Sequence, residues 1–128
     1  MSSSKQVIVS GGFDDIKSRD LRFLEEAAKL GELTVWLLPD AVIQKVTGRA
    51  PKFPLVERAY FLNAVRYVSR VVVAEAAEDL NALPDHLRAD LWADVADSAG
   101  PVREQFCREH KITYRVFTAE ALKDFPEP

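Results

Sequence analysis

The stretch "QVIVSGGFDDIKSRDLRFLEEAAKLGELTVWLL" (residues 6–38) decides the fold class of this chain. It opens with a short β-branched run that two glycines end, a pattern typical of a buried strand. The apolar spacing then becomes helical, and we expect a helix with Ser18 as its N-cap and Gly31 as its stop. A second apolar run over residues 33–38 predicts another strand. The order strand, helix, strand indicates a parallel α/β arrangement.

The rest of the chain repeats this alternation of short apolar runs and amphipathic stretches. The further expected elements are a short helix and a basic loop within residues 40–53, helices from Pro54 to residue 67 and from Pro101 to His110, weakly helical stretches around a turn at Pro84, a short C-terminal helix, and strands over residues 70–74, 90–95 and 112–117. We therefore expect an α/β fold with one domain (residues 1–128), a Rossmann-like three-layer sandwich with a five-stranded parallel sheet. Ligands of such sheets bind beyond the carboxyl ends of the strands, where strand order reverses.

The composition is that of a globular protein without a pronounced charge. The chain has 128 residues, is 48% hydrophobic and carries a formal net charge of -3. This balance gives no reason to expect nucleic acid or an anionic membrane as a partner. Neither a signal peptide nor a membrane-spanning run is apparent, and Cys107 is the only cysteine. We expect a cytoplasmic protein in which Cys107 is a packing residue.

The first turn is the earliest candidate for a binding site. Gly11 and Gly12 follow a strand and precede a helix, whose N-terminal N–H groups attract phosphates. A GxGxxG dinucleotide fingerprint is absent. On these two glycines alone, a simple tight turn is the favoured interpretation.

Longer motifs resemble the cytidylyltransferase-like nucleotidyltransferases, the family of glycerol-3-phosphate cytidylyltransferase and of the nucleotidyltransferase domain of heptose biosynthesis. The family's first motif reads G-x-F-D-x-x-H-x-G-H, and a helix with L-x-x-A and a closing glycine follows. Residues that match this motif are Gly11, Phe13, Asp14, Leu24, Ala27 and Gly31. The stretch "KVTGRAPKFPLVERAYFLNAVRYVSRVVV" (residues 45–73) is similar to the family's lysine-bearing loop, E-R helix and R-Y-V-D turn. It matches at Lys45, Glu57, Arg58, Arg66, Tyr67 and Val68.

The resemblance implies a Rossmann-like fold, transfer of a nucleotidyl group from CTP or ATP to a phosphorylated or related small substrate, and release of pyrophosphate. It also implies Mg²⁺ if the site is active, and a homodimer. In the family, the two histidines of the first motif contact the triphosphate and stabilise charge on the attacked phosphate.

The sequence departs from these family motifs at the positions that contact the triphosphate in the family. The two histidine positions hold Lys17 and Asp20, and the glycine between them is Arg19. The family's final S-S/T-T-x-x-R motif is missing from "TAEALKDFPEP" (residues 118–128). Lys17 keeps a positive charge, whereas Asp20 would repel a triphosphate.

We therefore expect a degenerate nucleotidyltransferase that binds a nucleotide (CTP or ATP) or a phosphorylated small molecule with little or no transfer. No residue is assigned as catalytic, and no metal site is expected. The residues expected to bind the nucleotide or phosphate are Gly11, Gly12, Phe13, Lys17, Arg19, Lys45 and Arg58. Two alternatives stay open: an active transferase in which Lys17 and Arg19 replace the imidazoles, and a non-catalytic dimeric interaction module.

For several residues a structural or surface position is the favoured or the alternative interpretation. For Arg49 and Lys52 we favour solvated loop positions. An alternative for Arg58 is a surface ion pair with Glu57 or Glu75. Trp36 and Trp92 are expected in the core, and His86 and His110 on the surface.

Overall fold

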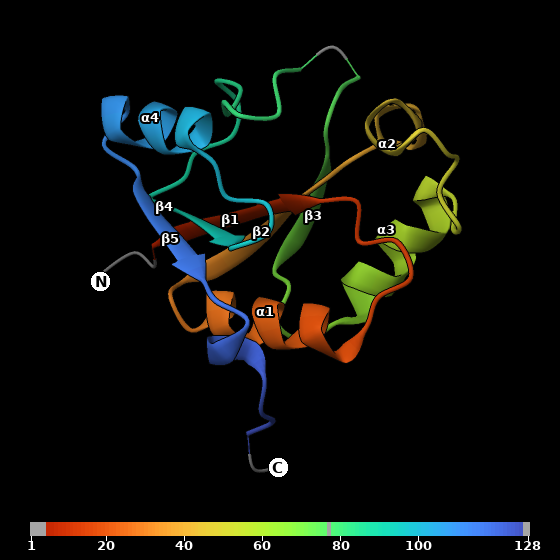
Figure 1. Ribbon diagram of the computed structural model, residues 1–128, viewed down its shortest axis with the longest axis horizontal. Coiled ribbons are helices and arrows are strands. Elements are labelled where there is room, and N and C mark those ends of the chain that lie inside the picture. Colours follow the sequence, from red (N-terminus) through yellow and green to blue (C-terminus); the bar gives the residue numbers. More distant parts are fainter. Residues whose placement is uncertain (1–4, 77, 127–128) are drawn as a thin grey trace.

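A five-stranded parallel sheet forms the centre of the protein in a computed structural model, which describes residues 5–76 and 78–126. The elements are β1 (Gln6–Gly11), α1 (Ser18–Ala28), β2 (Glu32–Leu37), α2 (Asp40–Thr47), α3 (Leu55–Ala64), β3 (Arg70–Val73), β4 (Leu91–Val95), α4 (Pro101–Glu109), β5 (Thr113–Phe117) and the 3₁₀ helix η1 (Glu120–Leu122). Figure 1 shows α1 and α3 on one side of the sheet and α4 on the other. The predicted Rossmann-like three-layer α/β sandwich is confirmed.

The strand order is β3-β2-β1-β4-β5, and every neighbouring pair is parallel. The chain builds outward from β1 through β2 to β3, then crosses to the other side of β1 for β4 and β5. Strand order therefore reverses between β1 and β4, where open α/β sheets bind their ligands.

Two apolar clusters hold the three layers together. One joins the sheet to α1 and α3 through residues that include Leu24 and Leu62, both 0% exposed. The other lies under α4 and contains Trp36, Trp92 and Cys107. The two indole rings meet edge to face, with centroids 6.3 Å apart, in the geometry that aromatic pairs prefer. The predicted core positions of these three residues are confirmed.

The start of α1 differs from the sequence prediction. Lys17, not Ser18, is the N-cap residue, and its N–H donates to the Asp20 carboxylate at 2.8 Å. The capping oxygen is therefore supplied by Asp20, the third residue of the helix, and not by the residue that precedes the helix. Pro54 likewise precedes the first residue of α3 instead of occupying that position.

The ends of two helices also differ. α3 ends at Ala64, because Val65 takes an extended conformation, so the predicted extension to residue 67 is wrong. α1 ends at Ala28, three residues before Gly31. The glycine is required there for close approach, since a Cβ on Gly31 would lie 2.3 Å from the Lys5 carbonyl oxygen.

The segment between β3 and β4 contains no helix among its described residues, so the predicted weakly helical stretches are wrong. Single turns form instead, including one in which the Leu87 N–H donates to the Pro84 carbonyl. Leu80, Leu83 and Leu87 pack from these turns against the second apolar cluster. None of the helices in the described part of the chain has the length and apolar character needed to cross a membrane.

Candidate functional site

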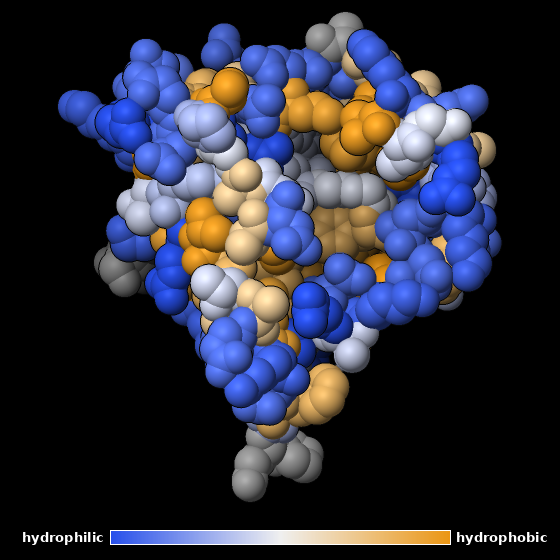
Figure 2. Space-filling model, viewed as in Figure 1, coloured by the Kyte–Doolittle hydropathy of each residue, from blue (hydrophilic) through white to orange (hydrophobic). Residues whose placement is uncertain are grey.

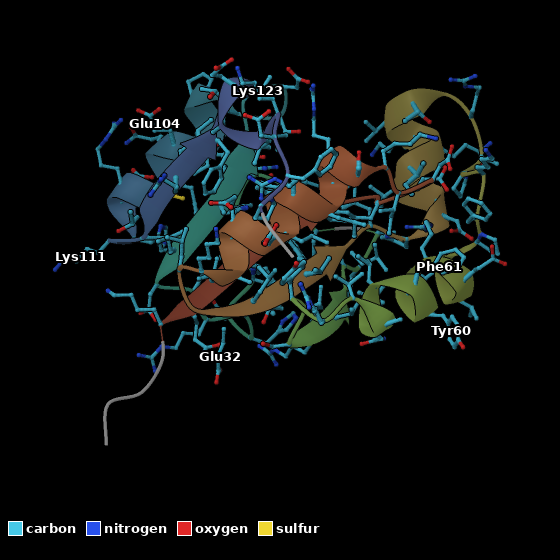
Figure 3. All side chains as sticks on the ribbon, turned by 90° about the horizontal axis from the view of Figure 1, so that it is seen from below. Glu32, Tyr60, Phe61, Glu104, Lys111 and Lys123 are labelled. Carbon is cyan, nitrogen blue, oxygen red and sulfur yellow. The ribbon has the colours of Figure 1, made fainter. Side chains whose placement is uncertain are left out.

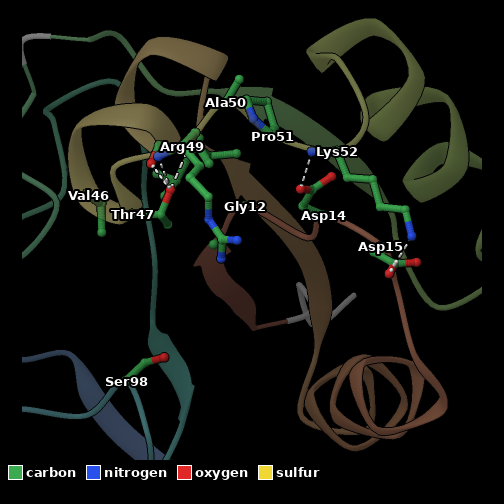
Figure 4. A pocket seen from close by; sticks show the side chains of 13 residues that line it. Gly12, Asp14, Asp15, Val46, Thr47, Arg49, Ala50, Pro51, Lys52 and Ser98 are labelled. Carbon is green, nitrogen blue, oxygen red and sulfur yellow. Dashed lines mark hydrogen bonds and ion pairs between the residues drawn. The ribbon is translucent and has the colours of Figure 1, made fainter.

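A cleft of about 610 Å³ opens at the carboxyl ends of β1 and β2 (Figure 4). Its lining residues come from both sides of the strand-order reversal and are Gly11, Gly12, Asp14, Asp15, Leu38, Ile43, Val46, Thr47, Arg49, Ala50, Pro51, Lys52 and Ser98. Its volume falls within the range of roughly 300–1,000 Å³ that is usual for small-molecule sites. Figure 2 shows the corresponding face of the molecule hollowed, with apolar residues around the hollow and hydrophilic residues beyond them. Position and size together make this cleft the candidate site.

The predicted glycine turn forms one wall of the cleft, and side chains approach it closely. A Cβ on Gly12 would lie 3.0 Å from Cδ1 of Ile43, and one on Gly11 would lie 3.2 Å from the Phe13 ring. Phe13 itself has a left-handed φ of 46° and does not line the cleft. The structure thus places the two glycines at the cleft and Phe13 behind them, as a packing partner of the turn.

Asp14 joins the basic loop that follows α2 to this turn through two hydrogen bonds. Its carboxylate accepts hydrogen bonds from the main-chain N–H groups of Lys52, at 2.6 Å, and Phe53, at 2.8 Å. Hydrogen bonds to a charged acceptor are shorter and stronger than neutral ones. One side chain therefore fixes the position of the loop that follows α2.

Arg58 lies beneath the cleft with its side chain 0% exposed. It donates to the carbonyl oxygens of Gly12 and Leu38, both at 2.8 Å, and of Phe53, at 2.9 Å. It also forms an ion pair with Asp40 at 2.6 Å. A surface pair with Glu57 or Glu75 is therefore wrong. The guanidinium is enclosed and engaged on each of its nitrogens, so the geometry gives Arg58 a positioning role under the cleft instead of direct phosphate contact.

Lys17 and Asp20, at the family's histidine positions, make contacts with neighbouring charges and with the helix end. The Lys17 ammonium lies 2.9 Å from the Asp15 carboxylate, and the Lys52 ammonium reaches the same oxygen at 3.1 Å. Hydrogen bonds from Lys17 and then from Lys52 lower the pKa of Asp15. Asp20 places its carboxylate at the N-terminal end of α1, where the helix dipole favours negative charge.

Arg19 lines a second, separate groove of about 170 Å³ at the ends of β4 and β5. Its other lining residues are Asp20, Phe23, Val95, Ala96, Asp97, Phe117, Ala119 and Leu122. The groove adjoins the start of residues 118–128, where the family's final motif is missing. Its volume is below the roughly 300 Å³ at which small-molecule sites begin.

The structure does not bring all predicted binding residues together. Lys45 is exposed on α2 and does not line the cleft. Arg49, for which the sequence favoured a solvated position, does line it, and Figure 4 shows its guanidinium directed into the cleft. The sequence feature that could have indicated the position of Arg49 is Gly48. Its left-handed φ of 81° ends α2 and changes the direction of the chain just before Arg49.

A metal site would need several carboxylate, histidine or cysteine side chains grouped together. Within residues 5–76 and 78–126, no group of three or more His, Cys, Asp and Glu side chains is placed to hold a metal ion. The two cleft carboxylates, Asp14 and Asp15, already bind main-chain N–H groups and ammonium groups. His86 and His110 are both exposed, as predicted.

Comparison with known proteins finds similarity to archaeal FAD synthases. It is 36% identical over 111 residues to the FAD synthase of Pyrococcus abyssi, covering 86% of this chain and 72% of that protein. It is 36% identical over 107 residues to the FAD synthase of Pyrococcus horikoshii, covering 83% of this chain and 69% of that protein. No protein-family model matches the chain.

A solved structure supports the fold. The lipopolysaccharide core biosynthesis protein from Thermoplasma volcanium superposes with a TM-score of 0.74 over 91% of this chain and 96% of that one, at 19% identity. At this identity the likeness concerns the fold alone. Together with the identity to two FAD synthases over most of their length, it leads to one conclusion: the chain belongs to the FAD synthase family and has a nucleotidyltransferase-like fold.

Proposed function

We propose that this protein binds a nucleotide or a phosphorylated small molecule at the cleft and performs little or no nucleotidyl transfer. The observation that carries the proposal is the start of α1. There Lys17 is paired with Asp15, and the Asp20 carboxylate accepts the hydrogen bond of the capping N–H. These are the two positions at which the resembled family has its histidines.

The electrostatics of this helix start argue against efficient transfer. Phosphoryl chemistry depends on positive groups aimed at the oxygens where charge develops. At one of these positions the chain has Lys17, whose positive charge is paired with the Asp15 carboxylate. At the other position it has the negatively charged carboxylate of Asp20. Groups of this kind contribute about 10²–10⁴-fold each to rate, so losing two leaves little turnover.

The relatives point to particular ligands. FAD consists of flavin mononucleotide joined to adenylate, so membership in the FAD synthase family supports ATP and flavin mononucleotide as ligands of this chain. CTP is the further nucleotide to test, since the motifs resemble cytidylyltransferases. Any Mg²⁺ would bind together with the triphosphate, because the cleft carboxylates of Asp14 and Asp15 already bind main-chain N–H and ammonium groups.

An active transferase is the second candidate. It is favoured by 36% identity to two FAD synthases and by the exposure of Lys17, whose side chain is 70% accessible. In that case Lys17 and Arg19 would supply the positive charge. The groove beside Arg19, at about 170 Å³, is smaller than the roughly 300 Å³ at which small-molecule sites begin, which counts against this candidate.

The test combines binding with turnover. Thermal-shift and calorimetric titrations with ATP, CTP and flavin mononucleotide measure binding, which raises the melting temperature of the native state. Pyrophosphate release from ATP or CTP, with flavin mononucleotide, glycerol 3-phosphate or sugar phosphates as acceptors, measures transfer. We expect binding without turnover. Clear turnover favours the second candidate, and the absence of binding by every ligand contradicts the proposal.

A variant tests the reason for low turnover. Lys17→His, Arg19→Gly and Asp20→His together restore the pattern of the resembled family at the start of α1. We expect little pyrophosphate release even then, because the final motif is still missing. Asp20→Asn alone is the control that removes the negative charge without adding an imidazole.

Two further expectations from the sequence belong to this proposal. The homodimer is supported by apolar residues on the outer face of α3, where Val56 and Tyr60 are 82% and 73% exposed. Figure 3 shows Tyr60 on the outer side of α3. The cytoplasmic location is supported by the single, unpaired cysteine. Cell fractionation tests the location.

A further inference from the structure

We propose that a groove between α4 and the segment before β4 docks an extended segment of another protein, in which basic residues stand on both sides of an apolar one. The groove has a volume of about 430 Å³, and its lining residues all differ from those of the cleft. α4 forms one wall, and Asp79, Asn81 and Ala82 form the other, where the segment runs beside the helix (Figure 1). This docking site is therefore separate from the nucleotide site.

The floor of the groove is apolar and ordered. It is formed by Ala82, Pro101, Val102 and Phe106. Val102 is 62% exposed, which is unusual for a residue of this size and polarity. The Phe106 ring meets the Trp92 ring edge to face, with centroids 6.3 Å apart, and stacks on the His110 ring at 4.0 Å. Because these contacts already hold the ring, a partner that covers the floor loses little affinity to ordering it.

A buried guanidinium holds the two walls together. Arg103 of α4 donates to the Asp94 carboxylate at 2.7 Å and to the Leu80 carbonyl at 2.9 Å. Leu80 lies between the groove residues of the opposite wall, so this charge-assisted hydrogen bond fixes the spacing of the walls. The Tyr114 hydroxyl donates to the same Asp94 oxygen at 2.7 Å. The groove is therefore formed before any partner binds.

The two charged residues that line the groove are both acidic. Asp79 and Glu109 carry exposed carboxylates. Neither takes part in an ion pair within residues 5–76 and 78–126. Basic side chains of a partner meet a complementary potential here, whereas an acidic segment is repelled.

The length of the groove and its amides favour an extended segment over a helix. The exposed side chains of Asn81 and Gln105 face the groove from opposite walls. They suit main-chain N–H and C=O groups, which an extended segment leaves free and a helix uses internally. From Pro101 to Glu109, α4 measures about 12 Å along its axis.

The same length gives the pattern of the partner. Four steps of an extended chain, at about 3.3 Å each, cover the groove, and alternate side chains point to the same face. A segment of the form basic–x–apolar–x–basic therefore directs two cations and one apolar side chain into the groove.

The experiment titrates the ¹⁵N-labelled protein with three acetylated, amidated peptides and follows its amide signals. Lys-Ser-Leu-Ser-Lys carries the full pattern, Lys-Ser-Ser-Ser-Lys lacks the apolar residue, and Glu-Ser-Leu-Ser-Glu reverses the charge. We expect the first peptide to shift signals of α4 and of residues 78–83, and to bind about tenfold more tightly than the other two. Added salt should weaken its binding, because the carboxylates are exposed.

Variants test the parts of the groove one by one. Asp79→Asn and Glu109→Gln should each weaken the full peptide about two- to fivefold, the factor expected for an exposed ion pair. Val102→Ser should also weaken it, because apolar contact area is lost. Glu104→Gln is the matched control, since Glu104 is an exposed carboxylate of α4 that pairs with Arg108 and lies outside the groove. It should leave the dissociation constant unchanged.

Several outcomes would overturn the docking site. They are no binding of the full peptide, equal binding of the peptide without leucine, signal shifts on another surface, and equal losses for Glu104→Gln and Glu109→Gln. Groove signals that move with protein concentration alone would show that a second copy of the chain occupies the groove instead. Melting temperatures of the variants exclude loss of the fold as the cause. Since no nucleotide is used, none of these results bears on the proposed function.

Discussion

The carboxylate of Asp14 accepts a hydrogen bond from the main-chain N–H of Lys52 at 2.6 Å, across 38 residues of sequence. The contact joins the turn after β1 to the loop after α2, and both segments line the cleft. The cleft therefore owes its shape to a polar contact between loops as well as to the sheet. Loss of this contact should affect the loop before it affects the fold.

Asp14→Ala tests this dependence. The substitution leaves the N–H groups of Lys52 and Phe53 without their acceptor, and we expect the free energy of unfolding to fall by about 1–2 kcal/mol. Amide hydrogen exchange at these two residues should accelerate more than exchange in β1 or β2. Urea unfolding and hydrogen exchange measure both effects.

Asp15→Ala is the matched control. Asp15 is the neighbouring carboxylate, and its partners are two exposed lysine ammonium groups. Exposed ion pairs contribute little to stability, so stability and loop exchange should stay close to wild type. Equal effects of the two substitutions would contradict the role assigned to Asp14.

Arg58→Met gives a larger expected effect. The variant removes the buried guanidinium and leaves the Gly12, Leu38 and Phe53 carbonyls unpaired beneath the cleft. We expect a loss of about 2–4 kcal/mol in the free energy of unfolding, because buried acceptors without partners are costly. Arg58→Lys should recover only part of it, since an ammonium cannot reach all these acceptors at once.

Arg66→Met is the comparison for Arg58. Arg66 is exposed and donates to the Tyr67 hydroxyl. Its loss should leave the urea midpoint unchanged. A similar midpoint for Arg58→Met and Arg66→Met would show that the buried hydrogen bonds of Arg58 contribute no net stability.

Strands and layers of the fold were predictable because their signals are local. The β-branched run before Gly11 and the apolar run before Pro39 match β1 and β2 to within one residue. The segment after β3 was not predictable in the same way. Leu80, Leu83 and Leu87 recur at helical spacing, yet they pack against the second cluster from successive turns. Tertiary packing overrides periodicity there.

The site was predictable at its glycine turn and less so at its charges. Arg58 was expected to bind phosphate, with a surface ion pair as the alternative. Its burial could not be predicted, because arginine is seldom buried and its acceptors are main-chain carbonyls that no sequence pattern marks. Arg49 and Lys45 lie four residues apart in one basic segment. Which of them faces the cleft depends on the left-handed conformation of Gly48 and on the hydrogen bonds of the Thr47 hydroxyl, and both exist only in the folded chain.

Tyr60→Lys tests the proposed homodimer. Val56 and Tyr60 lie one helical turn apart on the outer face of α3 and form an apolar surface. We expect the wild type to sediment as a dimer and Tyr60→Lys as a monomer, because burying an unpaired ammonium in the interface is unfavourable. Val102→Lys, on α4, is the matched control, since Val102 is 62% exposed and lies on the other side of the sheet. A monomeric wild type, or equal effects of the two substitutions, would contradict a dimer through α3.

Cys107 gives a prediction of pH dependence. Its side chain is buried in the second cluster, and burial raises the pKa of the thiol from 9.0 to about 11. The native state thus holds this proton more tightly than the unfolded state does. The resulting stability is fully present below pH 9 and is lost as the pH rises towards 11. Burial, followed by the hydrogen bond to Asp94, also raises the pKa of Tyr114, which acts in the same direction.

Urea unfolding between pH 7 and 11 measures this loss, and thiol labelling at pH 8 measures access to Cys107. We expect labelling to be slow in the native state and fast after unfolding, because the thiolate is the reactive form. Cys107→Ala should flatten the alkaline decline in stability, and adding Tyr114→Phe should flatten it further. The variants differ from the wild type only at Cys107 and Tyr114, so the comparison isolates these two groups. An alkaline decline of the same slope in the wild type and in both variants would show that neither group holds its proton through burial.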